Sequence, residues 1–194
     1  MISTSSLRTT AAAYTSPARG PLAGDVYAAA VVLDDQTLID YLNDSKKISE
    51  KRRELLYDEV IEKADAYCIA TASVEEIDRL NILQATMLAM KRAVAGLGVQ
   101  PDIALIDGNR LPDIDCECRY VIHGDAVSAS IAAASILAKV ARDRYMRELD
   151  EKYPQYCFGK HKGYGTAIHY EKLAEYGISD VHRRTFLKKL YDEK

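Results

Sequence analysis

The segment that most constrains the fold of this chain is residues 25–33, Asp-Val-Tyr-Ala-Ala-Ala-Val-Val-Leu, which is almost continuously apolar. Such a run is typical of a β-strand that is buried on both faces, because a strand with one face in water alternates between apolar and polar residues. Further strands are predicted over 66–72, 103–106 and 118–122, with helical spacing of apolar residues between them. Strands that alternate with helices in this way predict an α/β sandwich with a helical C-terminal appendage.

The predicted helices carry recognisable start signals. Ser49 precedes one helix as an N-cap, and Ser73 with Glu76 forms a capping box at the start of the next. From there the helical spacing of apolar residues runs through 77–94, which predicts one helix that ends near Gly96 and Gly98.

The C-terminal part of the chain differs in character from the rest. A long apolar helix over 130–149 is rich in small residues, and after Pro154 the sequence becomes aromatic and basic and ends in polar helices. We therefore predict one domain over residues 10–150 and a small C-terminal helical cap over residues 151–194 that packs on it. Residues 1–9 are predicted to be disordered.

A short segment before the first predicted strand, residues 14–24, combines two prolines and two glycines with a single arginine, Arg19. Proline fixes φ and removes a donor, whereas glycine admits conformations that are closed to other residues. An arginine between unblocked backbone amides suits contact with a phosphate or a ribose. By itself, however, the segment equally fits an ordinary turn that leads into a sheet.

Composition argues against several classes of protein. The chain of 194 residues has a formal net charge of -3 and a pI near 5.8, so no global positive field indicates a nucleic-acid-binding protein, although basic residues gather after residue 160. It has no apolar run of the roughly 18 residues that a membrane span requires. The four cysteines lack the spacing of a disulfide framework or a zinc site, which indicates reduced thiols and favours a cytoplasmic protein.

Two aspartates stand just after predicted strands, each beside a glycine. Asp107 follows the strand over 103–106, and Asp125 follows the strand over 118–122. Ligands gather at strand ends in open α/β sheets, and Mg²⁺ is bound by one or two carboxylates together with substrate phosphates. An aspartate in such a position also commonly caps a loop, so spacing alone leaves both interpretations open.

A set of motifs then occurs together and in a fixed order. Any one of them is a weak signal, whereas the ordered set is highly specific. It closely resembles bacterial ribonuclease HII, from Arg19 almost to the C-terminus. The motifs are residues 20–24 (Gly-Pro-Leu-Ala-Gly), 43–47 (Asn-Asp-Ser-Lys-Lys), 105–110 (Leu-Ile-Asp-Gly-Asn-Arg), 130–139 (Ser-Ile-Ala-Ala-Ala-Ser-Ile-Leu-Ala-Lys) with Arg142 and Asp143, 161–166 (His-Lys-Gly-Tyr-Gly-Thr) and 182–186 (His-Arg-Arg-Thr-Phe).

The resemblance implies an α/β, RNase H-like fold, with a central mixed sheet flanked by helices and a small C-terminal helical cap. It also implies a metal-dependent endonuclease of DNA replication and repair. Such enzymes hydrolyse the phosphodiester on the 5′ side of a ribonucleotide embedded in a duplex, so the implied partner is an RNA/DNA hybrid or ribonucleotide-containing duplex DNA. Four acidic residues hold the metals in this family, and Asp107 and Asp125 match the last two. These two are the implied catalytic residues and the implied ligands of Mg²⁺ or Mn²⁺. We expect a monomer that is not associated with a membrane.

Substrate-binding residues are implied by the same resemblance. Arg19 and Gly20 match the loop that meets the ribose 2′-hydroxyl, the group that separates RNA from DNA. Tyr164 matches a tyrosine that stacks beside the RNA–DNA junction, and Ser45 and Lys46 match polar residues near the substrate backbone. The histidines of the C-terminal segment and its late arginines are interpreted as solvated or core-edge residues, except as phosphate contacts.

The chain departs from the family at the first motif. The family pattern Asp-Glu-x-Gly-Arg-Gly is replaced by residues 15–20, Thr-Ser-Pro-Ala-Arg-Gly. Thr15 and Ser16 therefore occupy the positions of two metal-binding carboxylates, and residues 9–14 make a poor central strand compared with the apolar strand of the family. Two neutral hydroxyls do not supply the negative charge that a site for two dications and a phosphate needs. Weakened metal binding and catalytic impairment are expected.

Three hypotheses account for this departure. The first is a catalytically impaired pseudoenzyme that still binds duplexes. The second is a reading frame displaced by one base, because codons for Asp-Glu-Ser-Gly read one base out of frame encode Thr-Ser-Pro-Ala, although the same shift does not explain Tyr14. The third is a structural module that binds a partner, which the intact Arg19, Lys46 and Tyr164 disfavour.

Overall fold

The computed structural model describes residues 9–15, 20–34, 36–42 and 48–191, with residues 189–191 described by their backbone alone. Within these residues one sheet has the strand order β3-β2-β1-β4-β5. β1 pairs antiparallel with β2, as β2 does with β3, whereas β1 with β4 and β4 with β5 are parallel. The strands are β1 (Thr10–Thr15), β2 (Val26–Val32), β3 (Ala66–Ala72), β4 (Ile103–Asp107) and β5 (Glu117–Val121).

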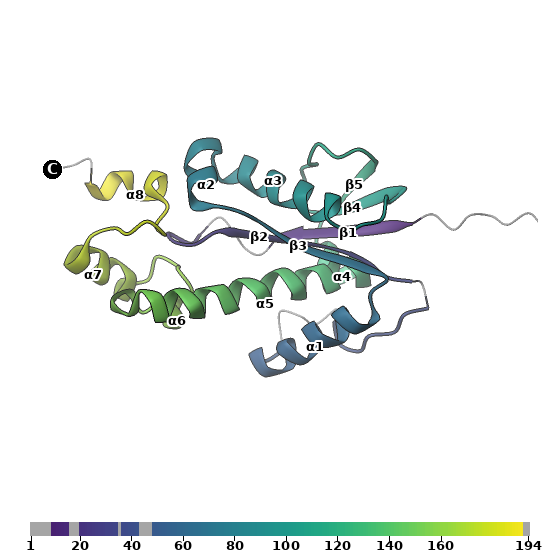
Figure 1. Cartoon of the computed structure of the whole chain (residues 1–194), viewed down its shortest axis with the longest axis horizontal. Helices are drawn as coiled ribbons and strands as arrows, with labels where there is room; N and C mark the ends of the chain where they lie inside the picture. Colours follow the sequence, from purple (N-terminus) through teal and green to yellow (C-terminus); the bar gives the residue numbers. More distant parts are fainter. Residues whose placement is uncertain (1–8, 16–19, 35, 43–47, 192–194) are drawn as a thin grey trace, which may run out of the picture.

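Helices cover both faces of this mixed sheet, so the predicted fold class is confirmed (Figure 1). One face carries α2 (Val74–Leu80) and α3 (Ile82–Ala95), and the other carries α1 (Glu50–Lys63) and the long α5 (Ala129–Lys152), which the short α4 (Gly124–Val127) precedes. The remaining elements gather at one end of the molecule: η2 (Pro154–Tyr156), α6 (Phe158–His161), α7 (Ala167–Tyr176) and α8 (Arg184–Tyr191).

The structure corrects the prediction that residues 9–14 make a poor central strand. β1 is the middle strand of the sheet, and Ala13 pairs with Ala30 on one side and Ile106 on the other. Ala11 and Ala13 pack on the α3 face and Ala12 on the α5 face, all fully buried. Strand preference depends strongly on packing, and small side chains suit a strand that two long helices cover closely.

The structure also corrects the prediction of one continuous helix over 77–94. Asn81 interrupts it with a φ of 71°, in the left-handed region that asparagine tolerates better than most residues. Its Oδ1 accepts hydrogen bonds from the N–H groups of Leu83 and Gln84, at 3.0 and 3.1 Å, and so caps α3. The chain therefore turns between α2 and α3.

The two predicted N-caps are confirmed. Ser49 Oγ accepts from the N–H of Arg52 at 3.2 Å, and Ser73 and Glu76 make both hydrogen bonds of the capping box, at 3.3 and 3.0 Å. Most of the predicted disordered segment, residues 1–8, lies outside the described residues. Thr9 is held in place, since its N–H donates to Asp102 Oδ2 at 2.8 Å.

A third hydrophobic cluster joins the C-terminal elements to the rest of the molecule. It combines the segment before β2, the end of α5 and the C-terminal segment, through Leu22, Ala23, Met146, Leu149, Tyr156, Phe158, Leu173 and Leu187. The end of the chain thus packs directly on the loop that begins at Gly20, while the division into domains at residue 150 stays a prediction. Throughout the described ranges, every helix is too short or too polar to cross a membrane.

Candidate active site

Asp107 and Asp125 are delivered to the same edge of the sheet. Asp107 is the last residue of β4, and Asp125 lies in the first turn of α4, which follows the parallel neighbour β5. The N–H of Gly124 donates to Oδ1 of Asp107 at 2.9 Å and so links the two positions. Asp125 is only 5% exposed. The two carboxylates therefore belong to one small, largely buried region.

Gly124 is required by this close approach. A Cβ atom at this position would lie 2.5 Å from Cδ1 of Ile131 and 3.2 Å from Oδ1 of Asp107. The first distance is far inside van der Waals contact, so a larger residue would require the Ile131 side chain to move, and the second is tighter than an ordinary contact. The glycine beside Asp125 thus suits the close packing of this turn against Ile131 and Asp107.

Tyr14 is a site residue that sequence reasoning did not identify. Its side chain packs on the α5 face of β1, and the next residue, Thr15, faces the opposite side because side chains alternate along a strand. Burial, followed by the charges of Asp125 and Asp107, raises the pKa of the Tyr14 phenol. This hydroxyl is therefore neutral at physiological pH. The one signal in the sequence is a lone aromatic residue in a strand of alanines and threonines.

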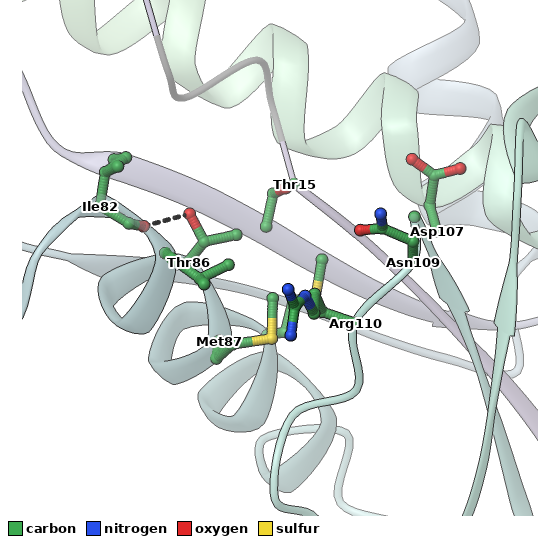
Figure 2. A pocket seen from close by; sticks show the side chains of 10 residues that line it. Thr15, Ile82, Thr86, Met87, Asp107, Asn109 and Arg110 are labelled. Carbon is green, nitrogen blue, oxygen red and sulfur yellow. Dashed lines mark hydrogen bonds between the residues drawn. The ribbon is translucent and has the colours of Figure 1, made fainter.

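Thr15 lines a cavity of about 160 Å³ between the end of β4 and α3, together with Thr86, Met87, Asp107 and Arg110 (Figure 2). In Figure 2 the Thr15 side chain extends toward the side chains of α3, whereas the Asp107 carboxylate points away from them. Thr15 and Asp107 thus share a cavity, but their side chains leave the sheet in different directions.

Tyr164 lies in the loop between α6 and α7 and meets the loop that begins at Gly20. An isolated bridge pairs it with Pro21, and the N–H of Leu22 donates to the carbonyl of Gly163 at 2.7 Å. A Cβ atom on Gly20 would lie 3.2 Å from Cε1 of the Tyr164 ring, so the glycine backbone packs against the ring. The Tyr164 phenol is also near enough to contribute to the raised pKa of Tyr14. The structure thus brings Gly20 and Tyr164 together beside the aspartates.

The buried guanidinium group of Arg142 lies beside the Tyr164 ring. Arg142 of α5 is 3% exposed, and its Nη2 donates to the carbonyl of Lys162 at 2.8 Å. The centre of its guanidinium group lies 5.7 Å from the centroid of the Tyr164 ring, within the range of a cation–π contact. Burial lowers the pKa of Arg142. The Tyr164 ring therefore packs against a positively charged side chain of α5.

The late arginines are predicted to be solvated or core-edge residues, and Arg183 is not solvated, because it is fully buried. Its Nε donates to the carbonyl of Gly24 at 2.9 Å and its Nη1 to the carbonyl of Pro21 at 3.1 Å. Its own N–H donates to the carbonyl of Leu22 at 2.8 Å. Burial lowers the pKa of Arg183 to about 10, so it keeps its charge at neutral pH. Arg183 thus ties the C-terminal segment to the Gly20 loop.

The histidines of the C-terminal segment also lie in the interior. His169 and His182 are 0% and 1% exposed, and His161 is 7% exposed. Burial lowers the pKa of all three imidazoles, to about 4 for His169 and for His182. These residues are neutral at physiological pH. Of the two predicted alternatives, solvated or core-edge residues, their burial excludes the first and agrees with the second.

The other predicted site residues, Ser16, Arg19, Ser45 and Lys46, lie outside the described residues, and their roles stay predictions. Within the described ranges, no three His, Cys, Asp or Glu side chains gather in a way that could hold a metal ion. The carboxylates at the site are those of Asp107 and Asp125.

The arrangement of sheet and helices is shared with known nucleases. The ribonuclease H2 of Pyrococcus horikoshii superposes with a TM-score of 0.79, at 23% identity, over 95% of this chain and 98% of that one. A Bst-RNase HIII solved in complex with Mn²⁺ superposes with a TM-score of 0.69, at 16% identity, over 88% of this chain and 63% of that one. The fold is therefore RNase H-like.

Sequence comparison identifies the family within this fold. The family model for ribonuclease HII matches residues 18–192. A ribonuclease HII of Methylibium petroleiphilum is 61% identical over 168 residues, which are 87% of this chain and 85% of that protein. The chain belongs to the ribonuclease HII family of endoribonucleases.

Proposed function

We propose that this chain binds duplexes that contain ribonucleotides. We also propose that, with Thr15 and Ser16 in place of two carboxylates, it is impaired in cleaving them on the 5′ side of the ribonucleotide. One observation carries the proposal. Folding brings the Gly20 backbone, the Tyr164 ring and the two aspartates to one end of the sheet, although they come from distant parts of the sequence. This proximity supports the proposal that duplex recognition and phosphate chemistry take place beside each other.

Recognition of the ribonucleotide is assigned to the contact between Gly20 and Tyr164. A glycine lets the backbone approach a sugar closely, and the 2′-hydroxyl offers both a donor and an acceptor. Tyr164 as a residue is 37% exposed, which is consistent with part of its ring being available for stacking on a base or sugar. Arg19, Ser45 and Lys46 are proposed to contact the ribose and the substrate backbone.

The donor set at the site fits one divalent cation of the Mg²⁺ or Mn²⁺ type. Asp107 and Asp125 supply hard carboxylate oxygens in one region, and Mg²⁺ is commonly held by one or two carboxylates together with substrate phosphates. When bound, such an ion stabilises negative charge on the phosphate and activates water. Neither the neutral Tyr14 phenol nor Thr15, which extends toward α3, adds a negative charge.

The expected consequence is a large loss of rate. If each missing carboxylate removes a few kcal/mol of transition-state stabilisation, the rate falls by several powers of ten, at about 1.4 kcal/mol per factor of ten. Metal affinity is also expected to be far below that of a site with four carboxylates.

The test compares two chains on a duplex with a single ribonucleotide, in Mg²⁺ and in Mn²⁺. The unaltered chain should cleave at or near background. A chain with the family motif restored at residues 15–18, by Thr15→Asp, Ser16→Glu, Pro17→Ala and Ala18→Gly, should cleave it. Asp107→Asn in the restored chain is the control that should abolish the recovered activity. Robust cleavage by the unaltered chain would contradict this account of the metal site.

Binding measurements separate the duplex-binding protein from a structural module. Binding should weaken as salt rises, because each phosphate contact releases a counterion. Lys46→Ala should weaken binding to every duplex, whereas Tyr164→Ala should mainly reduce the preference for the ribonucleotide-containing one. Failure to bind any duplex at low salt would favour the structural module.

The nucleotide sequence around codons 10 to 20 tests the displaced reading frame directly.

A further inference from the structure

We infer that the buried histidines His169 and His182 are positioning residues, which hold Tyr164 in the place where it reads the ribonucleotide. This inference rests on the proposed function, in which Tyr164 meets the duplex. It assigns a task to two imidazoles that are nearly inaccessible to solvent.

A chain of hydrogen bonds runs from the C-terminal segment to Tyr164. The N–H of Ser179 donates to Nδ1 of His182 at 3.0 Å. Nε2 of His182 lies 3.1 Å from Nε2 of His169, and Nδ1 of His169 lies 2.9 Å from the carbonyl oxygen of Tyr164. Each link is within hydrogen-bonding distance, so the four groups form one continuous path.

The two ends of this path determine where its protons lie. A backbone N–H only donates, so Nδ1 of His182 is an acceptor, and the neutral ring carries its proton on Nε2. His182 therefore donates to Nε2 of His169, and His169 carries its proton on Nδ1. A carbonyl oxygen only accepts, so this Nδ1–H donates to Tyr164. Donors and acceptors match at each link only when both rings are neutral.

The path acts on the backbone beside the exposed ring. The Tyr164 carbonyl also accepts from the N–H of Thr166 at 2.8 Å, so two donors fix it. His161 stacks on His169 with ring centroids 4.3 Å apart, which restrains the His169 ring. The backbone of His182 pairs with Ala23 in the loop that begins at Gly20. The same histidines thus connect both sides of the contact between Gly20 and Tyr164.

Two substitutions at one position separate positioning from stability. In His169→Asn the amide N–H can replace Nδ1–H and keep the bond to Tyr164, but the bond from His182 is lost. In His169→Gln the amide oxygen can replace Nε2 and keep the bond from His182, but the bond to Tyr164 is lost. Each variant loses one buried hydrogen bond, so urea unfolding should show similar losses of stability.

The readout is the ratio of the dissociation constants for an all-DNA duplex and for the same duplex with one ribonucleotide, measured by fluorescence anisotropy in EDTA. His169→Gln should lower this ratio by about fivefold, because stacking of a base on an aromatic ring typically changes affinity by about fivefold or more. His169→Asn should keep the ratio within about twofold of the unaltered chain. Equal ratios in the two variants would overturn the inference. Tyr164→Ala is measured in parallel, and if it leaves the ratio unchanged, the proposed role of Tyr164 itself fails.

A second measurement needs no substitution. Two-bond ¹H–¹⁵N NMR spectra of the unaltered chain report which nitrogen of each imidazole carries the proton. The inference requires Nδ1–H in His169 and Nε2–H in His182 at neutral pH. A proton on Nε2 of His169, or a charged His169, would overturn it even if the variants do not fold.

Discussion

Acidification should destabilise this protein through its buried histidines. Burial lowers the pKa of His169 and His182 to about 4 in the folded chain, whereas an unfolded histidine titrates near 6.5. Between these values the unfolded chain binds more protons than the folded one, so the free energy of unfolding rises with pH in this window. The stability that neutral imidazoles contribute is fully present above about pH 6.5 and is lost as the pH falls toward 4.

The size of the effect follows from the two pKa values. At about pH 5 an unfolded histidine is almost fully protonated and the folded one is mostly neutral, which corresponds to a loss of about 2 kcal/mol per residue. The charge on His169 is itself one cause of the lowered pKa of His182, so the pair is coupled, and about 2 to 4 kcal/mol is expected for both. This is a large share of the roughly 5 to 15 kcal/mol that stabilises a typical domain.

The assay is urea unfolding at several pH values between about 7.5 and 5, followed by far-ultraviolet circular dichroism because the chain has no tryptophan. Carboxylates titrate in the same range, so the informative quantity is the difference between the unaltered chain and His182→Gln. From the upper to the lower pH the unaltered chain should lose about 2 kcal/mol more than this variant. His123 is exposed, and His123→Gln is the matched control that should keep the pH dependence of the unaltered chain. Parallel profiles for the unaltered chain and His182→Gln would refute the reasoning.

Three further changes test the site and its supports. Tyr14→Asp should raise Mn²⁺ affinity in calorimetry more than Thr15→Asp does, because the charges of Asp125 and Asp107 act on the Tyr14 phenol, whereas the Thr15 side chain extends toward α3; equal affinities would contradict this register of β1. Gly124→Ala should destabilise the chain by about 1 to 3 kcal/mol in urea unfolding, since its Cβ would overlap a neighbouring side chain, and unchanged stability would argue against the close approach to Asp107. Arg183→Met should destabilise it by about 2 to 5 kcal/mol by leaving buried carbonyl groups without their donor, and a loss below about 1 kcal/mol would contradict that role.

The positions of most elements could be predicted from local sequence. The strand over 66–72 and the N-caps Ser49 and Ser73 are all where the sequence indicates. These features depend on neighbours within a few residues, so a short window contains the interactions that decide them. The family motifs likewise identify Asp107, Asp125, Gly20 and Tyr164 as candidates, because the resemblance is a property of the sequence itself.

Only the tertiary structure decided which side chains these elements bring together. Ala11, Ala12 and Ala13 look unsuited to a central strand until α3 and α5 cover both of its faces. Tyr14 becomes a neighbour of the two aspartates, and His169 becomes a neighbour of His182, through contacts across the fold. Burial and contacts across the fold set the pKa values of Tyr14, His169 and His182, and the residues beside each of them in the sequence do not encode these contacts.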